Sequence, residues 1–203
     1  MATEGKKIQR REVLQRLEKA LHADDLVIAA LAGTTVDCFE TMHRPGNLYL
    51  VGMGMVTPVG FGLATALPNR RVIALDTDGS LLLSPSILGV VGVYKPRNFR
   101  ILVFDNERLY GSRGGPPSQT AHGADLAGMA RAAGIEQADS LEGAGILDSK
   151  ISWFLSARGP VILVVKVDPS YLRGTGPSMS GQENKFQFVR HIEATERITI
   201  LGA

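Results

Sequence analysis

The sequence predicts an α/β fold in which a parallel sheet lies between two layers of helices. Residues 26–31 and 161–165 form short, continuous apolar runs, which are typical of strands buried on both faces. Segments with apolar residues at helical spacing separate these and other short apolar runs. Strands that alternate with helices build a parallel sheet in a three-layer α/β/α arrangement.

The composition is that of one globular domain. The chain has 203 residues, of which 44% are hydrophobic and 21% charged, so it is too apolar for a disordered protein. A net charge of +2 argues against a nucleic acid as partner. Cys38 is the single cysteine, which excludes an internal disulfide and a multi-cysteine metal site. No signal peptide or membrane-spanning stretch is evident, so we expect a cytoplasmic protein that does not contact a membrane.

The first half of the chain alternates regularly. Residues 7–22 have apolar side chains at helical spacing with Lys, Arg and Glu between them, which indicates an amphipathic helix. The strand at 26–31 is expected to end in a turn at 32–35, and a second strand follows at 47–51. Residues 58–67 indicate a helix, because Pro58 lies in its first turn and Pro68 follows its end.

The second half repeats this alternation. Strands are expected at 72–75, 100–104 and 160–167, and helices at 85–91, 125–133 and 143–157. A Gly/Pro loop occupies 111–117. Residues 168–183 are rich in Gly, Ser and Pro and are expected to form a mobile arm before a closing helix at 183–196. We therefore divide the chain into a domain at 1–168 and an arm with a helix at 169–203.

Polar residues follow several predicted strands. Ligands of open parallel sheets bind at the carboxyl ends of the strands, so these residues are expected to share one site. Asp78 and Asn106 offer the oxygen ligands that suit Mg²⁺, and Gly79-Ser80 offers backbone N–H groups to an anion. Taken alone, Asp-Gly after a strand is more simply a turn. Gly-x-Gly-x-x-Gly, the P-loop and the Gly-x-Ser-x-Gly elbow are all absent.

The spacing of these residues makes the pattern more specific. Asp78-Gly79-Ser80 lies 28 positions before Asn106, which Asp105 precedes at the end of an apolar strand. This arrangement resembles the thiamine diphosphate motif. Residues 26–168 as a whole resemble the diphosphate-binding domain of thiamine diphosphate-dependent decarboxylases, above all the beta subunit of sulfopyruvate decarboxylase and the matching half of phosphonopyruvate decarboxylase.

The resemblance implies roles for individual residues. The side chains of Asp78 and Asn106 and the carbonyl of Arg108 correspond to Mg²⁺ ligands. Met53, flanked by two glycines, corresponds to the apolar wedge that holds the cofactor bent, although a core side chain that fills a gap is the alternative. The full set of implied cofactor contacts is Gly33, Thr34, Thr35, Gly52, Met53, Asp78, Gly79, Ser80, Asn106, Tyr110 and Gly111.

Two departures from the family pattern concern the cofactor and the substrate. Thr77 replaces the first glycine of Gly-Asp-Gly and would be strained if that position needed a positive φ. The loop after Asn106 carries Arg113, which either binds an acidic group of the substrate or is a solvated side chain. His122 is our candidate acid–base or anion contact, with an exposed histidine as the alternative. We expect His22, His43 and His191 at the surface, and Cys38 as a small buried apolar residue.

The resemblance implies an enzyme subunit that needs thiamine diphosphate and Mg²⁺ and acts on a small 2-oxo acid. In this class a glutamate from a separate pyrimidine-binding domain activates the cofactor. Neither Glu40 nor Glu107 lies in a context resembling that site, so we expect an alpha-type partner subunit and a dimer or larger oligomer. Half of an acetolactate synthase-like carboligase, or a non-catalytic assembly subunit that kept the fold, are the alternatives.

Overall fold

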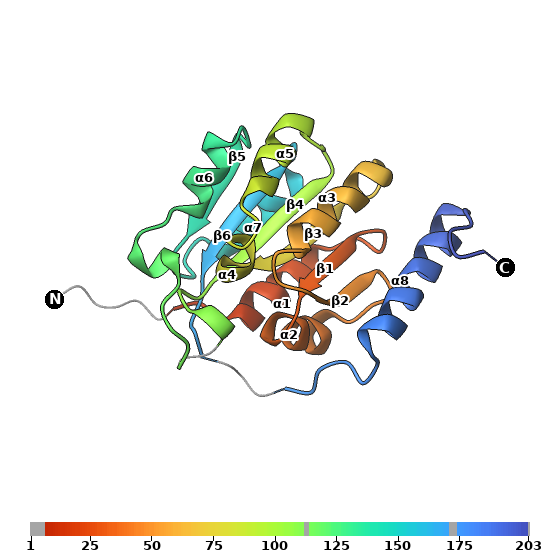
Figure 1. The fold of residues 1–203 in the computed structure, drawn as a ribbon, viewed down its shortest axis with the longest axis horizontal. Helices are drawn as coiled ribbons and strands as arrows, with labels where there is room; N and C mark the ends of the chain where they lie inside the picture. Colours follow the sequence, from red (N-terminus) through yellow and green to blue (C-terminus); the bar gives the residue numbers. More distant parts are fainter. Residues whose placement is uncertain (1–6, 112–113, 171–173, 203) are drawn as a thin grey trace.

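The computed structural model describes residues 7–111, 114–170 and 174–202 of the chain. Figure 1 shows a twisted sheet with helices on both faces. Its strands run in the order β2-β1-β3-β4-β6-β5, and every pair of neighbours is parallel. The strands are β1 (Leu26–Ala30), β2 (Asn47–Val51), β3 (Val72–Thr77), β4 (Phe99–Asp105), β5 (Gln137–Leu141) and β6 (Val161–Lys166). The predicted parallel three-layer fold is confirmed.

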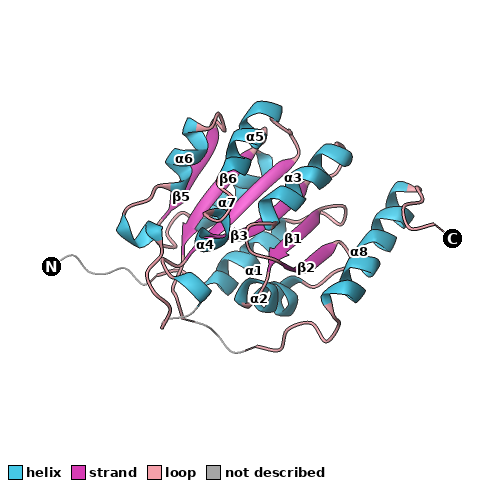
Figure 2. Cartoon of the chain, in the orientation of Figure 1, coloured by secondary structure: helices cyan, strands magenta, loops and turns pink. Residues whose placement is uncertain are grey.

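Helices cover both faces of the sheet (Figure 2). One hydrophobic cluster on each face attaches them to it. The first face is covered by α1 (Arg10–Ala20), α2 (Gly33–Met42) and α7 (Leu147–Ser156). The second face is covered by α3 (Val56–Ala66), α5 (Ser86–Tyr94), α6 (Leu126–Ala132) and α8 (Gly181–Glu196). Because β1, β3, β4 and β6 are buried along nearly all of their length, they are mostly apolar rather than alternating, with Asp76, Arg100 and Asp105 as buried polar exceptions.

The strand order places a switch point between β1 and β3. From β1 the chain moves outward to β2, and it then returns to the other side of β1 to form β3. The loops that follow β1 and β3 therefore diverge to opposite faces of the sheet and leave a crevice between them. The carboxyl end of β3 continues directly into α4 (Asp78–Leu81), a single helical turn.

Two elements differ from the expectation. The turn predicted at 32–35 is instead the start of α2, because Ala32 takes a positive φ of 62° and reverses the chain within one residue. The strand β5 was not predicted, since it is short, polar and only partly buried. It pairs with β6 alone at the edge of the sheet. Because its other edge has no neighbouring strand and its residues are only partly buried, the strand does not need to be apolar.

The C-terminal helix α8 packs on the edge strand β2. Ser180 and Glu183 form a capping box that starts the helix at Gly181, two residues before the predicted boundary. The buried side chain of Asn184 accepts a hydrogen bond from the N–H of Tyr49 (2.6 Å) and donates one to the carbonyl of Asn47 (3.1 Å). The division of the chain at residue 168 stays a prediction. None of the helices in the described part of the chain is long and apolar enough to cross a bilayer.

Two glycines of α5 allow a matched test of how α5 packs against the end of α6. A Cβ on Gly92 would lie 1.8 Å from the carbonyl oxygen of Ala133, whereas a Cβ on Gly89 would meet nothing within 4 Å. We predict that Gly92→Ala destabilises the protein by about 1–3 kcal/mol or more, because α5 must move away from the end of α6. Gly89→Ala is expected to stabilise it by up to about 1 kcal/mol through helix propensity. Chemical denaturation of both variants checks this, and equal stabilities would contradict the packing.

Candidate functional site

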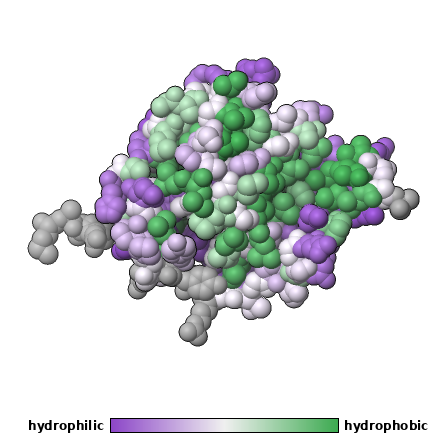
Figure 3. Space-filling model, in the orientation of Figure 1, coloured by the Kyte–Doolittle hydropathy of each residue, from purple (hydrophilic) through white to green (hydrophobic). Residues whose placement is uncertain are grey.

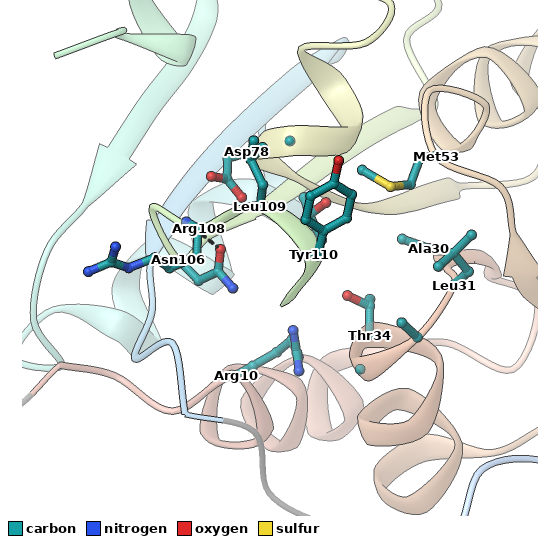
Figure 4. A pocket seen from close by; sticks show the side chains of 14 residues that line it. Arg10, Ala30, Leu31, Thr34, Met53, Asp78, Asn106, Arg108, Leu109 and Tyr110 are labelled. Atoms are coloured by element: carbon teal, nitrogen blue, oxygen red, sulfur yellow. Dashed lines mark hydrogen bonds between the residues drawn. The ribbon is translucent and has the colours of Figure 1, made fainter. Parts of the chain in front are cut away.

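A cavity of about 230 Å³ opens at the carboxyl edge of the sheet, at the switch point between β1 and β3 (Figure 4). Its walls come from the first turn of α1, the start of α2, the β2–α3 loop, the start of α4 and the loop after β4. The lining residues are Arg10, Ala30, Leu31, Ala32, Gly33, Thr34, Met53, Thr77, Asp78, Gly79, Asn106, Arg108, Leu109 and Tyr110.

Asp78 supplies a carboxylate that is 1% exposed. One of its oxygens accepts hydrogen bonds from the hydroxyls of Ser118 (2.6 Å) and Thr120 (3.3 Å). Burial raises the pKa of Asp78 to about 6, the bond from Ser118 opposes this shift, and the nearby charge of Asp105 adds to it. No lysine or arginine of the described chain forms an ion pair with Asp78. The fold therefore buries a carboxylate whose charge a bound cation would compensate.

The loop after β4 presents Asn106 and Arg108 to the same cavity. The side-chain oxygen of Asn106 accepts the N–H of Arg108 (3.1 Å), which forms a tight turn at the strand end. The loop is closed by backbone bonds, from Leu109 to Pro116 (2.9 Å) and from Ser118 to Glu107 (3.1 Å). This closure brings Ser118 back to Asp78, so the loop that carries Asn106 also makes a hydrogen bond to the other expected metal ligand.

Thr77 is not strained in the place of the family's glycine. Its φ of −128° and ψ of 160° are ordinary extended values. Its hydroxyl caps α4 by accepting the N–H of Ser80 (3.3 Å). The concern raised by this departure from the motif is therefore removed, because threonine suits both the strand end and the cap.

Met53 and Gly79 lie on one wall of the cavity. A Cβ on Gly79 would be 3.8 Å from the methyl carbon of Met53 and 3.2 Å from a methyl of Leu109. The Met53 loop is fixed to α4 at Gly54, whose N–H donates to Ser80 (3.0 Å) and whose carbonyl accepts from Ser84 (2.6 Å). The loop therefore holds the Met53 side chain at the cavity, where it is 36% exposed rather than buried in the core.

The start of α2 faces the cavity with free donors. Gly33 and Thr34 line it, and α2 begins without a side-chain cap. Thr34 is 1% exposed, and its hydroxyl has no hydrogen-bond partner in the part of the chain that the structure describes. Thr35 does not line the cavity, because its hydroxyl joins the carbonyl of Ala30 (2.8 Å) to the N–H of Leu50 (2.9 Å). A buried hydroxyl without a partner next to a helix N-terminus suits a bound anion.

These observations test whether thiamine diphosphate and Mg²⁺ fit the cavity. Within the described residues there is no group of three or more His, Cys, Asp or Glu side chains that could enclose a metal. One carboxylate, one amide and a backbone carbonyl instead suit Mg²⁺, which keeps water or phosphate oxygens as its other ligands. The Thr34 hydroxyl, which has no partner among the described residues, and Gly79, which lines the cavity, offer contacts to the diphosphate. The residues that line the cavity therefore fit thiamine diphosphate with Mg²⁺.

The remaining predicted residues lie at or beyond the margin of the cavity. Tyr110 lines it but is 80% exposed, and it adopts a positive φ of 60°. Gly52 is exposed and Ser80 is buried within α4, and neither is among the lining residues. Gly111 ends a 3₁₀ turn at Leu109–Gly111. Their contacts with the cofactor stay predictions.

His122 ends a second 3₁₀ turn, Gln119–His122, where it is exposed and outside the cavity lining. Its catalytic role stays a prediction. Arg113, with Ser112 before it, lies outside the described residues.

The other predicted side chains are placed as follows. His22 and His43 are exposed, as expected, and burial raises the pKa of Cys38 to about 12, so this thiol is a core residue. The expectation for His191 was wrong: it is only partly exposed, and burial lowers its pKa.

Arg10 and Leu109 line the cavity although no sequence motif predicts either of them. Arg10 belongs to α1, far from the motif in sequence, and its spacing there only indicates the polar side of a helix. Leu109 resembles any apolar loop residue. The one signal for Leu109 was its position within the loop that follows Asn106.

Comparison with known proteins gives consistent matches. Residues 32–165 match the family described as thiamine pyrophosphate enzyme, C-terminal TPP binding domain. The chain is 30% identical over 173 residues to the sulfopyruvate decarboxylase subunit beta of Methanococcus maripaludis, covering 84% of this chain and 90% of that one. It is 30% identical to the phosphonopyruvate decarboxylase of Streptomyces viridochromogenes over 80% of this chain, but spans only 41% of that protein.

A similarity in structure agrees with these matches. The X-ray structure of a proposed thiamin diphosphate-dependent enzyme from Mycobacterium smegmatis superposes with a TM-score of 0.68. It covers 81% of this chain and 32% of that one at 22% identity, so it supports the fold alone.

The buried state of Asp78 predicts a pH-dependent gain in stability on its neutralisation. Because its pKa is about 6 in the folded chain and its ordinary value is 3.8, ionisation destabilises the metal-free protein as the pH rises through this window. We predict that Asp78→Asn stabilises the metal-free protein by roughly 1–3 kcal/mol at pH 8 and by little at pH 4. Thermal unfolding in EDTA at both pH values checks this, with the exposed Asp148→Asn as control. A variant less stable than wild type at pH 8 would refute it.

Proposed function

The chain belongs to the thiamine pyrophosphate enzymes, through their C-terminal TPP binding domain, and on this basis we propose that it is the diphosphate-binding subunit of a 2-oxo acid decarboxylase. The substrate class we propose is that of sulfopyruvate and phosphonopyruvate. The observation that carries the proposal is the juxtaposition of Asp78, Asn106 and Gly79 around one cavity at the switch point. We also propose that the enzyme needs Mg²⁺ and is cytoplasmic.

Each wall of the cavity has a role in this proposal. The Asp78 carboxylate, the Asn106 side chain and the Arg108 carbonyl would hold Mg²⁺, and Gly79 and Thr34 would donate to the diphosphate. Met53, on the same wall as Gly79, would support the organic part of the cofactor. When bound, thiamine diphosphate supplies a carbon nucleophile for the 2-oxo group and accepts the electrons released with CO₂.

The geometry weakens one alternative function. A non-catalytic assembly subunit was supported by Thr77 and by the altered loop around Arg113. Since Thr77 is unstrained and caps α4, it gives no reason to expect a disabled site. A carboligase half shares the same cofactor chemistry, and no observation on this chain favours it over decarboxylation.

The lining of the cavity supports a partner subunit. Asp78 is its sole carboxylic acid among the residues that the structure describes. Glu107 is paired with Lys7 and Lys166, and Glu40 with Arg11, so neither is poised to activate the pyrimidine. Three of the sulfopyruvate decarboxylase relatives are named as beta subunits, and this chain spans 98% of the one from Methanothermobacter thermautotrophicus. We infer that a second chain supplies the activating glutamate.

The surface around the cavity mouth is suited to such a partner. Apolar side chains surround it at the carboxyl edge of the sheet, and Figure 3 shows a broad hydrophobic area on the face that carries α3 and α5. Leu31, Met53 and Tyr110 are exposed apolar residues of the cavity lining. Other exposed apolar residues are Leu50 in β2, Met55 and Leu83 in loops, and Val90, Val93 and Tyr94 on α5. Exposed apolar area of this kind marks a protein interface.

We predict that the chain binds thiamine diphosphate only with Mg²⁺, and that Asp78→Ala abolishes this binding because the metal loses its charged ligand. Isothermal titration of the full chain, with Mg²⁺ and with EDTA, checks this. Affinity should be highest well above pH 6 and weaken as the pH falls through about 6, since a proton then competes with Mg²⁺ for Asp78. Binding that is unaffected by EDTA, or retained in Asp78→Ala, would contradict the proposal.

We further predict that decarboxylation needs the partner. The full chain alone is expected to turn over sulfopyruvate or phosphonopyruvate at no more than about a thousandth of the rate seen with its partner, because an acid–base group is missing. Coupled assay of the aldehyde product, with and without the alpha-type subunit, measures this. A full rate from the chain alone would overturn the two-subunit proposal.

A further inference from the structure

Arg10 is the cationic side chain of α1 that reaches the cavity, although neither the motif nor its spacing indicates it. Its side chain is only 12% exposed. Figure 4 shows its guanidinium on the cavity side of α1, beside Thr34 and across the cavity from Asp78. An arginine withdrawn from solvent in this way requires partners for its N–H groups.

The guanidinium is held at one edge only. Its Nε donates to a carboxylate oxygen of Asp37 (2.7 Å), whose other oxygen accepts from the Nε of Arg11 (2.7 Å). Arg11 in turn pairs with Glu40 (2.5 Å). The guanidinium carbon of Arg10 also lies 5.9 Å from the centre of the Phe104 ring, in the strand that leads to Asn106. These contacts fix the orientation of Arg10 without using its outer nitrogens.

The outer nitrogens, Nη1 and Nη2, have no hydrogen-bond acceptor among the described residues. They lie on the same side of the cavity as the Thr34 hydroxyl, which is buried and equally without a partner. Two sets of unused donors from different helices therefore face one space. A planar pair of N–H groups beside a hydroxyl matches the oxygens of a phosphate group.

We propose that Arg10 binds the terminal phosphate of the cofactor, with Asp37 as the residue that positions it; this rests on the proposed function. Asp78 and Asn106 would hold the metal end of the diphosphate, and Met53, across the cavity from Arg10, would contact the organic part. Arg10 would therefore contact the diphosphate rather than the reacting carbon. The charges of Arg10, Arg11, Asp37 and Glu40 cancel. Arg10 would therefore attract the phosphate through short-range hydrogen bonds rather than through a long-range electrostatic field.

The test compares affinities of the full chain for three probes in the presence of Mg²⁺: thiamine diphosphate, thiamine monophosphate and inorganic pyrophosphate. Arg10→Gln is expected to weaken thiamine diphosphate and pyrophosphate by about tenfold or more, because a charge-assisted bond is lost. Thiamine monophosphate, which lacks the terminal phosphate, should bind as it does to wild type. Arg16→Gln, which removes a charge from the same helix outside the cavity, should change none of the three.

Arg10→Lys keeps the charge but loses the planar pair of donors, and is expected to weaken pyrophosphate several-fold. This variant carries the test if Arg10→Gln does not fold. Wild-type affinity for pyrophosphate in either folded variant would overturn the proposal, as would unchanged cofactor affinity with a raised KM for the 2-oxo acid, which would place Arg10 at the substrate. If wild type itself bound neither thiamine diphosphate nor pyrophosphate, the proposed function would fail and the role of Arg10 with it.

Discussion

Asp78 directly follows the central strand β3, and the fold removes its carboxylate from water and surrounds it with hydroxyls instead of a cation. Ser118 donates to it from the loop after β4, and the hydroxyl of Thr120, which has one proton to donate, lies 3.3 Å from Asp78 and 2.7 Å from Asp105. Asp105 is neutralised from the other side by Lys166 of β6 (2.9 Å). Three adjacent strands thus support one buried charge. Because this arrangement is unfavourable for the empty protein, it favours a bound metal, which is the usual balance between stability and function at a site.

The topology explains why the other groups assemble around Asp78. At the switch point, α2 leaves β1 toward one face of the sheet and α3 lies on the other, so the crevice between β1 and β3 remains open. The start of α2 and the first turn of α1 form one wall, and α4 with the β4 loop forms the other. Each wall carries unsatisfied donors or acceptors that a phosphate and its metal can use together. A ligand bound there would connect the two halves of the sheet.

Much of the fold and of the candidate site could be predicted from the sequence, and the features that could not be predicted have physical reasons. Asp78 and Asn106 were found because parallel strands bring their carboxyl ends to one edge, whatever the details of packing. The start of α2 was missed because the residue with a positive φ is Ala32, while the neighbouring Gly33 is already helical. The strand β5 was missed because an edge strand needs no apolar run. Arg10 was missed because its role depends on the packing of α1 against α2, which periodicity does not specify.

The central claim is that Asp78 and Asn106 hold a metal that binds the diphosphate of the cofactor. A crystal structure of the full chain with thiamine diphosphate and Mn²⁺, located by its anomalous signal, tests this most directly. We predict one Mn²⁺ bound by the carboxylate of Asp78, the side-chain oxygen of Asn106 and the carbonyl of Arg108, together with diphosphate oxygens. A metal bound elsewhere, or a diphosphate outside the cavity between β1 and β3, would contradict it.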